Sequence, residues 1–315
     1  MSGLYKYLRS IVVAIITITT ILSTTAQQHY ILHVDLNKTI LADDPAGGKS
    51  TDDVLNQLLA EEYCDCWDTS IKNPISYSDY VTKHLFPGEK SDKKLKNLRN
   101  QKLFNFTQYL HSINHPAAPM LQKRFELLST KIKQSGNSVF SSFYKLIQFL
   151  KENNYKYSII LRTFGDDIDR VLTELENKLE PSFFAWHGQF NNGTLEVLSL
   201  TSDEKLVLNT TTDIYNFFIA AGNCAIRDDW KTWNSYGEIA EYGKLLPIDE
   251  TNTTIIPIFF DDNAKDGIIN ARNLKNNSFI PTTDLIEQGT ICVVDTLAAI
   301  QNDQYFIDIL KQVIL

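Results

Sequence analysis

The chain has 315 residues and a formal net charge of −8 at pH 7, with 43% hydrophobic and 22% charged residues. This length suits one large domain or two, and the composition is that of a globular protein. The acidic balance argues against a nucleic-acid-binding protein, because such proteins carry a basic excess or a basic stripe.

The first 26 residues have the features of a secretory signal peptide. Lys6 and Arg9 precede an apolar run from Ile11 to Leu22, and small residues up to Ala26 offer a cleavage site. The run is shorter than the roughly 20 residues that a membrane span needs, so we expect cleavage rather than retention as a signal anchor. The mature protein is then secreted or lies in the endomembrane lumen, and we expect no membrane partner after cleavage.

Six Asn-x-Ser/Thr triplets agree with this localisation, because the lumenal glycosylation machinery recognises them. Such triplets also arise by chance in a chain rich in Asn and Thr, so they support the leader without proving it. Together the two features predict a secreted glycoprotein. The triplets begin at Asn37, Asn105, Asn192, Asn209, Asn252 and Asn276.

The stretch from Tyr30 to Ile40 predicts a buried strand that ends in a polar turn. Its apolar, β-branched run stops at Asp35, and Asn37 and Thr39 follow. An α/β sheet presents reactive groups in this way, at the carboxyl end of a strand. Gly48-Lys49-Ser50 is not a phosphate-binding loop, because Asp43 stands where such a loop requires its first glycine.

A polar, lysine-rich region follows this strand. An acidic first turn at Thr51 and leucines at helical spacing predict a helix, and further helices and loops extend to about Gly136. We interpret residues 45–136 as an insertion between two strands of the sheet.

The second half of the chain alternates helices and strands, the pattern of a parallel α/β sheet. The strand at 157–163 ends on Thr163, and a later strand over 255–260 ends on Asp261-Asp262, although Pro257 is poorly tolerated inside a central strand. Other predicted elements are helices over 140–150, 168–179, 212–221 and 305–314, a hairpin over 183–200, and short strands over 225–227 and 291–294.

Three strands therefore end in polar groups, at Asp35, Thr163 and Asp261-Asp262. In a parallel sheet these ends lie on one edge, so the groups converge if the strands are neighbours. A single aspartate at a strand end is more often a helix cap than a catalyst. Three strands that end in this way favour a catalytic site over separate helix caps.

In this order the residues resemble the haloacid dehalogenase-like hydrolases, most of which are phosphatases that form an aspartyl-phosphate. The resemblance rests on Asp-x-Asn-x-Thr at 35–39, Thr163, a following lysine and the pair Asp261-Asp262. It implies an α/β fold with a Rossmann-like three-layer parallel sheet core, residues 27–44 and 137–315, and a mainly helical cap, residues 45–136.

The resemblance also implies a role for each residue. Asp35 is the nucleophile, and Thr163 binds phosphoryl oxygens. Mg²⁺ is held by Asp35, the backbone carbonyl of Asn37, and Asp261 or Asp262. The implied partner is a small phosphorylated substrate or a phosphorylated macromolecule.

Two lysines compete for the remaining role. Lys244 lies 17 residues before Asp261 and Lys231 lies 30 before it. We favour Lys244. A lysine in a loop that leads back to the sheet edge can reach the site with fewer helices and strands in between. Taken alone, either lysine is more simply a solvated surface residue.

The departure from the family pattern is Asn37, where its phosphatases usually carry a second aspartate that protonates the leaving group and activates water. An amide does neither, and loss of a general acid–base costs about 10²–10⁴-fold in rate. The chain then hydrolyses slowly, prefers good leaving groups, uses another acid such as Asp43 or Asp44, or is a catalytically inactive binding protein. The predicted function is a Mg²⁺-dependent phosphatase acting on a phosphate ester, with the inactive binding protein as the alternative and a dehalogenase or phosphotransferase on the same fold as the third choice.

The four cysteines are too few for a disulfide-built scaffold. Cys64 and Cys66 resemble half of a metal clamp, but no second pair follows at zinc-finger spacing, so a loop disulfide or free thiols are expected. Cys224 and Cys292 lie in apolar runs and are expected to be buried.

Overall fold

The computed structural model describes residues 27–45, 47–89, 92–134, 138–180 and 182–314. The predicted leader, residues 1–26, lies outside this described part. Within it, no helix is both long and apolar enough to cross a bilayer.

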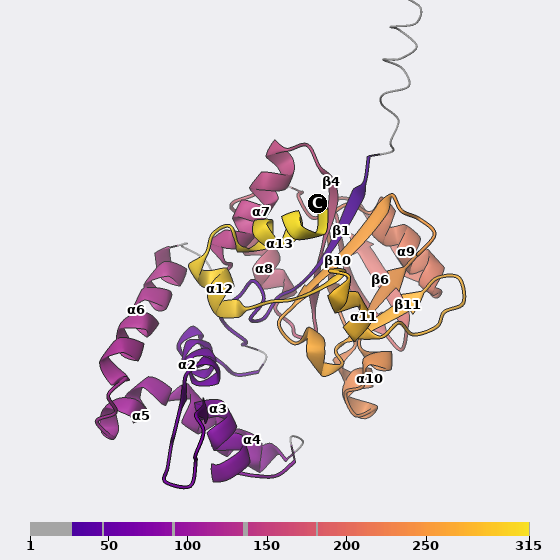
Figure 1. Cartoon of the computed structure of the whole chain (residues 1–315). Helices are drawn as coiled ribbons and strands as arrows, with labels where there is room; N and C mark the ends of the chain where they lie inside the picture. The colour runs from indigo at the N-terminus through magenta and orange to yellow at the C-terminus, as the bar shows by residue number, and fades with distance from the viewer. Residues whose placement is uncertain (1–26, 46, 90–91, 135–137, 181, 315) are drawn as a thin grey trace, which may run out of the picture.

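An eight-stranded sheet forms the centre of the protein (Figure 1). The first six strands of the spatial order are parallel, and the last two continue from the sixth as antiparallel neighbours. The predicted α/β class with a mostly parallel sheet is confirmed. The order is β12 (Ile291–Val293), β10 (Ile255–Asp261), β1 (His29–Asp35), β4 (Lys156–Thr163), β8 (Cys224–Arg227), β5 (Trp186–Asn191), β6 (Thr194–Ser199) and β7 (Lys205–Leu208).

The central strand β1 is buried along its whole length, as its nearly continuous apolar sequence requires. Successive side chains point to opposite faces of the sheet. Leu32 and Val34 therefore join the larger hydrophobic core, while Ile31 joins a separate one on the other face. The larger core contains residues of α7 (Ser141–Glu152), α8 (Ile168–Glu176), α12 (Thr296–Gln301) and α13 (Tyr305–Ile314).

The opposite face is covered by a helix and by a second, smaller sheet. Helix α9 (Thr211–Ala220) packs on Ile31 and Ile160. Beside it, β9 (Lys244–Ile248) and β11 (Ile269–Asn273) form a two-stranded parallel sheet, which packs with α11 (Thr282–Glu287) against Phe259 of β10. The smaller sheet is not hydrogen-bonded into the central one as a strand.

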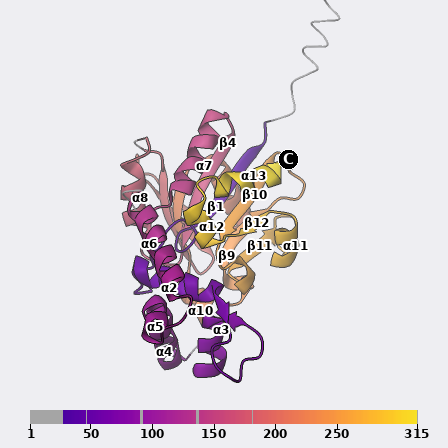
Figure 2. The ribbon, with the colours of Figure 1, turned by 60° about the vertical axis from the view of Figure 1, so that its left-hand side comes forward.

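The segment between β1 and β4 is mainly helical, as predicted. Figure 1 and Figure 2 both place α2 to α5 together beyond the end of the sheet toward which β1 runs. A capping box between Ser50 and Asp53 starts the first helix. Buried Asn56 ties α2 to α5 by accepting from the backbone N–H and hydroxyl of Thr107, at 3.0 and 2.9 Å. Between β1 and α7, the elements are α2 (Thr51–Glu62), β2 (Cys64–Asp65), β3 (Ile75–Ser76), α3 (Tyr77–Tyr80), a π-helical turn (Val81–Leu85), α4 (Lys93–Phe104), α5 (Phe106–Ser112) and α6 (Ala118–Gln134).

Pro257 is the third residue of β10 and lies inside the strand. It is tolerated because β10 pairs with β12 only from Phe259 onward, so near Pro257 the strand has a free edge. The predicted environments of the four cysteines are confirmed. Cys64 and Cys66 are exposed free thiols, and Cys224 and Cys292 are buried.

Leu32 provides a test of this packing. It is fully buried, so Leu32→Ala leaves a cavity and should lower the free energy of unfolding by about 2–5 kcal/mol. Leu198→Ala, at a leucine that is 50% exposed, should cost far less. Urea unfolding monitored by circular dichroism measures both, and equal losses would contradict the described core.

Candidate active site

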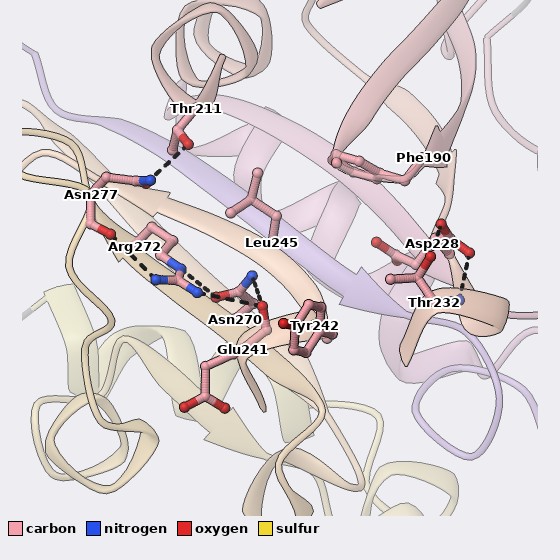
Figure 3. A pocket seen from close by; sticks show the side chains of 13 residues that line it. Phe190, Thr211, Asp228, Thr232, Glu241, Tyr242, Leu245, Asn270, Arg272 and Asn277 are labelled. Carbon is pink, nitrogen blue, oxygen red and sulfur yellow. Dashed lines mark hydrogen bonds between the residues drawn. The ribbon is translucent and has the colours of Figure 1, made fainter. Parts of the chain in front are cut away.

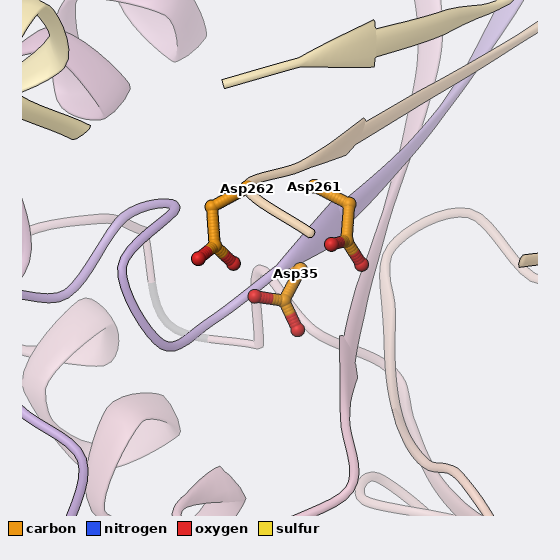
Figure 4. Close-up of side chains that lie close together, drawn as sticks. All are labelled: Asp35, Asp261 and Asp262. Atoms are coloured by element: carbon orange, nitrogen blue, oxygen red, sulfur yellow. The ribbon is translucent and has the colours of Figure 1, made fainter. Parts of the chain in front are cut away.

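The carboxyl ends of three neighbouring strands bring the predicted site residues to one edge of the sheet. Asp35 ends β1, Thr163 ends β4 and Asp261 ends β10, and β1 lies between the other two. With Asp262, which follows β10, Asp35 and Asp261 place carboxylate oxygens within 4.8 Å of one another. Figure 4 shows the three carboxylates close together at the ends of these strands.

Lys244 lies directly against two of these aspartates. It begins β9, is only 1% exposed, and its Nζ is 2.5 Å from Asp35 Oδ1 and 2.8 Å from Asp261 Oδ2. Lys231 lies instead on α10 (Trp230–Ser235) with its side chain exposed, and no hydrogen bond or ion pair of the described residues joins it to the cluster. Of the two candidate lysines, Lys244 is the one at the aspartates.

Thr39 joins the ends of β1 and β10. Its buried hydroxyl donates to Asp35 Oδ2 at 3.1 Å and accepts from the backbone N–H of Asp262 at 3.1 Å. A tight turn carries it back to the site, with Lys38 in the left-handed region at φ 62°. Sequence analysis includes Thr39 in the first motif but assigns it no role; its four-residue spacing from Asp35 is the signal that could have suggested one.

Burial sets the electrostatics of the cluster. It raises the pKa of Asp35 to about 7, with Lys244 opposing the shift and the charge of Asp261 adding to it. Burial likewise raises the pKa of Asp262 well above its usual value, and the charges of Asp261 and Asp35 add to that effect. For Lys244, the charges of Asp261 and Asp35 outweigh burial, which alone lowers the pKa, and hold it above its usual value.

Among the described residues, Asp35, Asp261 and Asp262 form the group of three acidic side chains whose oxygens lie close enough together that they could hold a cation. Lys244 contacts Asp35 and Asp261, and the charge of Lys38 opposes the pKa shift of Asp262 without cancelling it, so the three acids keep a formal excess of negative charge. All donors are carboxylate oxygens, the ligands preferred by hard divalent cations. A cation here would share Asp35 and Asp261 with Lys244.

The side-chain amide of Asn37 contacts two acidic residues, Asp167 and Asp44. Its Nδ2 donates to Asp167 Oδ2 at 3.3 Å and, at 3.5 Å, to Asp44 Oδ1. Its Oδ1 is buried without a hydrogen-bond partner in the described part of the chain. The predicted substitute Asp43 is engaged elsewhere, because Arg170 donates to both of its oxygens. Asp167, which the sequence did not single out, is therefore the buried acid nearest this amide.

Thr163 is fully buried at the end of β4, one residue beyond the partner of Asp35 in the β1–β4 register. Its hydroxyl oxygen accepts from the backbone N–H of Gly165 at 2.9 Å. The hydroxyl proton therefore stays available for donation to an anion.

A separate pocket of about 290 Å³ lies on the side of β9 opposite to the Lys244 side chain (Figure 3). Gly243 and Leu245 line it, and because neighbouring residues of a strand point to opposite faces, the Lys244 side chain points away from it. Its polar groups largely bond one another: Arg272 donates to Asn270 Oδ1 at 2.7 Å and to the carbonyl of Glu241 at 3.4 Å.

In comparisons with models of protein families, with curated proteins and with solved structures, the chain matches none of them. The site is therefore interpreted from its own geometry.

The excess of negative charge among Asp35, Asp261 and Asp262 should lower the free energy of unfolding of the protein when no divalent metal is present. Without divalent metal at pH 7.5, Asp262→Asn should raise the free energy of unfolding by about 0.5–2 kcal/mol, a typical gain when strain at a functional site is relieved. The sign follows from the pKa of Asp262, which is raised by burial, so the contribution of Asp262 to wild-type stability falls as pH rises above about 4, where an unfolded aspartate titrates.

Thermal unfolding at several pH values measures this gain, which should shrink toward pH 4. Asp203→Asn, at an exposed acid, serves as the control and should change little. Destabilisation by Asp262→Asn throughout this pH range would contradict the charge excess.

Proposed function

We propose that this protein is a Mg²⁺-dependent phosphatase of the haloacid dehalogenase-like type, acting on a phosphate ester through an aspartyl-phosphate on Asp35. The observation that carries the proposal is the buried Lys244 ammonium between Asp35 and Asp261, with Asp262 beside them. On this proposal the central sheet and its helices are a Rossmann-like three-layer core, and α2 to α6 form the cap.

The chemistry follows from where each group lies. An oxygen of Asp35 attacks phosphorus in line, the bond from phosphorus to the leaving oxygen breaks, and water then attacks the aspartyl-phosphate to release phosphate and restore Asp35. Thr39 orients the attacking carboxylate, and Lys244 and Thr163 donate to the phosphoryl oxygens. Asp35, the backbone carbonyl of Asn37, and Asp261 or Asp262 would hold Mg²⁺, which would supply positive charge that offsets repulsion between carboxylate and phosphate.

The proposed substrate is a small phosphorylated molecule or a phosphorylated macromolecule outside the cytosol, since the predicted leader directs the chain to the secretory route. On this proposal the helices α2 to α5, which lie beyond the end of the sheet toward which β1 runs (Figure 2), would select among such substrates.

The test of this proposal is hydrolysis of an activated aryl phosphate by the purified mature protein. Phosphate release should require Mg²⁺ and stop with EDTA. Asp35→Asn should abolish it, and Lys244→Met should lower kcat/KM by about 10²–10³-fold, the usual cost of losing one transition-state donor. Asp203→Asn should retain full activity. Turnover by Asp35→Asn equal to wild type would rule out Asp35 as the nucleophile.

Asn37 predicts a dependence on the leaving group. Because an amide cannot protonate the departing oxygen, alkyl phosphates should turn over far more slowly than aryl phosphates. Asn37→Asp should raise kcat for an alkyl phosphate by about 10²-fold or more, within the range of general acid catalysis, and should change the aryl phosphate rate less. The ratio of the two rates, measured for both proteins, checks this; an unchanged ratio would show that another group already supplies the proton.

The same amide supports a second candidate function, a catalytically inactive binding protein on this fold. Mg²⁺ binding separates the two, because a ligand that binds only the folded state raises the melting temperature. A Mg²⁺-dependent shift with turnover supports the phosphatase. Absence of both at millimolar Mg²⁺ favours the binding protein.

A further inference from the structure

Arg162 is a fully buried arginine in β4, directly before Thr163. Its Nε donates to Asp228 Oδ2 at 3.0 Å and its Nη2 donates to Asp228 Oδ1. The two side chains are 0% and 2% exposed, so this is a buried two-pronged ion pair, with Asp228 also lining the pocket beside β9. The proposed reaction uses neither residue.

The remaining nitrogen of the guanidinium reaches β9. Nη1 donates to the backbone carbonyl of Leu245 at 2.9 Å, one residue after Lys244. Since β9 pairs only with β11, it lacks the backbone ladder that fixes strands of the central sheet. Among the described residues, the hydrogen bonds between β9 and the central sheet come from the Lys244 and Arg162 side chains. Arg162 therefore supplies the hydrogen bond that joins β9 to the central sheet next to Lys244.

The surroundings hold this guanidinium in one orientation. Nη1 also donates to Nδ1 of His33, at 3.1 Å. Three aromatic rings surround the guanidinium carbon at 5.5–5.9 Å. Four N–H bonds and three ring faces leave it no alternative position. The rings are those of Phe190, Phe218 and Phe259.

We propose that Arg162 and Asp228 are positioning residues that hold β9 so that Lys244 reaches both Asp35 and Asp261. The effect on catalysis rests on the proposed phosphatase function, whereas the effect on Lys244 does not. A buried ion pair adds little net stability over apolar residues of similar size, so its retention is better explained by placement than by folding energy. An apolar pair would fill the space but would not bind the Leu245 carbonyl.

The first experiment measures Lys244 directly and needs no turnover. An amine-reactive reagent is applied to the folded protein, and labelling of each lysine is followed by mass spectrometry. In the wild type, Lys244 should label far more slowly than exposed Lys231. In Arg162→Met/Asp228→Asn, labelling at Lys244 should rise at least about tenfold, the change expected when local opening replaces a fixed contact. Labelling at Lys49, which is 15% exposed, should not change and so reports against general unfolding.

The matched control is Arg124→Met/Glu62→Gln, which removes an ion pair of the same chemistry from the inserted helices. It should leave Lys244 protected. If the double variant does not fold, Arg162→Lys gives the answer, because a lysine keeps the charge but cannot reach Asp228 and the Leu245 carbonyl together. Unchanged protection of Lys244 in the folded variant would overturn the proposal.

The second experiment is a double-mutant cycle on phosphate release. Arg162→Met/Asp228→Asn should lower kcat/KM by about 10–100-fold in the wild-type background, since misplacement of a catalytic group by an ångström costs about 10²-fold. In the Lys244→Met background it should have almost no further effect, because its target is gone. Equal losses in both backgrounds would show a general structural role and overturn the proposal. Absence of any wild-type turnover would refute the phosphatase proposal and leave the labelling experiment to decide the positioning role.

Discussion

The ammonium group of Lys244 holds the ends of two separate strands together, at 2.5 Å from Asp35 and 2.8 Å from Asp261. Burial makes this contact strong and also obligatory, because an unpaired charge at this depth is very costly. The site around it depends on that balance. Two carboxylates against one ammonium already leave a negative excess, and Asp262 increases it. A place where the fold maintains unbalanced charge is where a charged ligand has most to contribute.

The fold supplies this contact from segments far apart in the chain. Parallel pairing of β1 with β4 and β10 aligns three strand ends, and the turn after β1 returns Thr39 to hydrogen-bond both Asp35 and the backbone of Asp262. Lys244 comes from outside the central sheet, on a strand of the smaller one. The central sheet therefore positions the acids. Lys244 lies outside this sheet, and we propose that the hydrogen bonds of Arg162 hold its strand in place.

Much of the fold was predictable because its signals are local. The uninterrupted apolar sequence of β1, the amphipathic spacing of α7 and the turn at Asn191 to Gly193 each determine their element from neighbouring residues. The short strands β7 and β11 were missed, since four or five residues carry little periodic signal and pairing with other segments decides their structure.

The candidate site was predictable to the same degree. Asp35, Thr163 and Asp261 follow apolar runs, so strand ends could be inferred, and their meeting follows from strand order. The contacts of Asn37 with Asp167 and of Arg162 with Asp228 were not predictable, because they join residues 130 and 66 positions apart without any repeating pattern.

The most direct measurement of the central claim is detection of the covalent intermediate. The protein is mixed with Mg²⁺ and an activated aryl phosphate, quenched in acid and digested, and the peptide that carries residues 29–35 is analysed by mass spectrometry. The account predicts a phosphoryl group on Asp35, absent when Mg²⁺ is withheld and absent in Asp35→Asn. Phosphate release by the wild type without phosphorylation of Asp35, or with phosphorylation elsewhere, would contradict it.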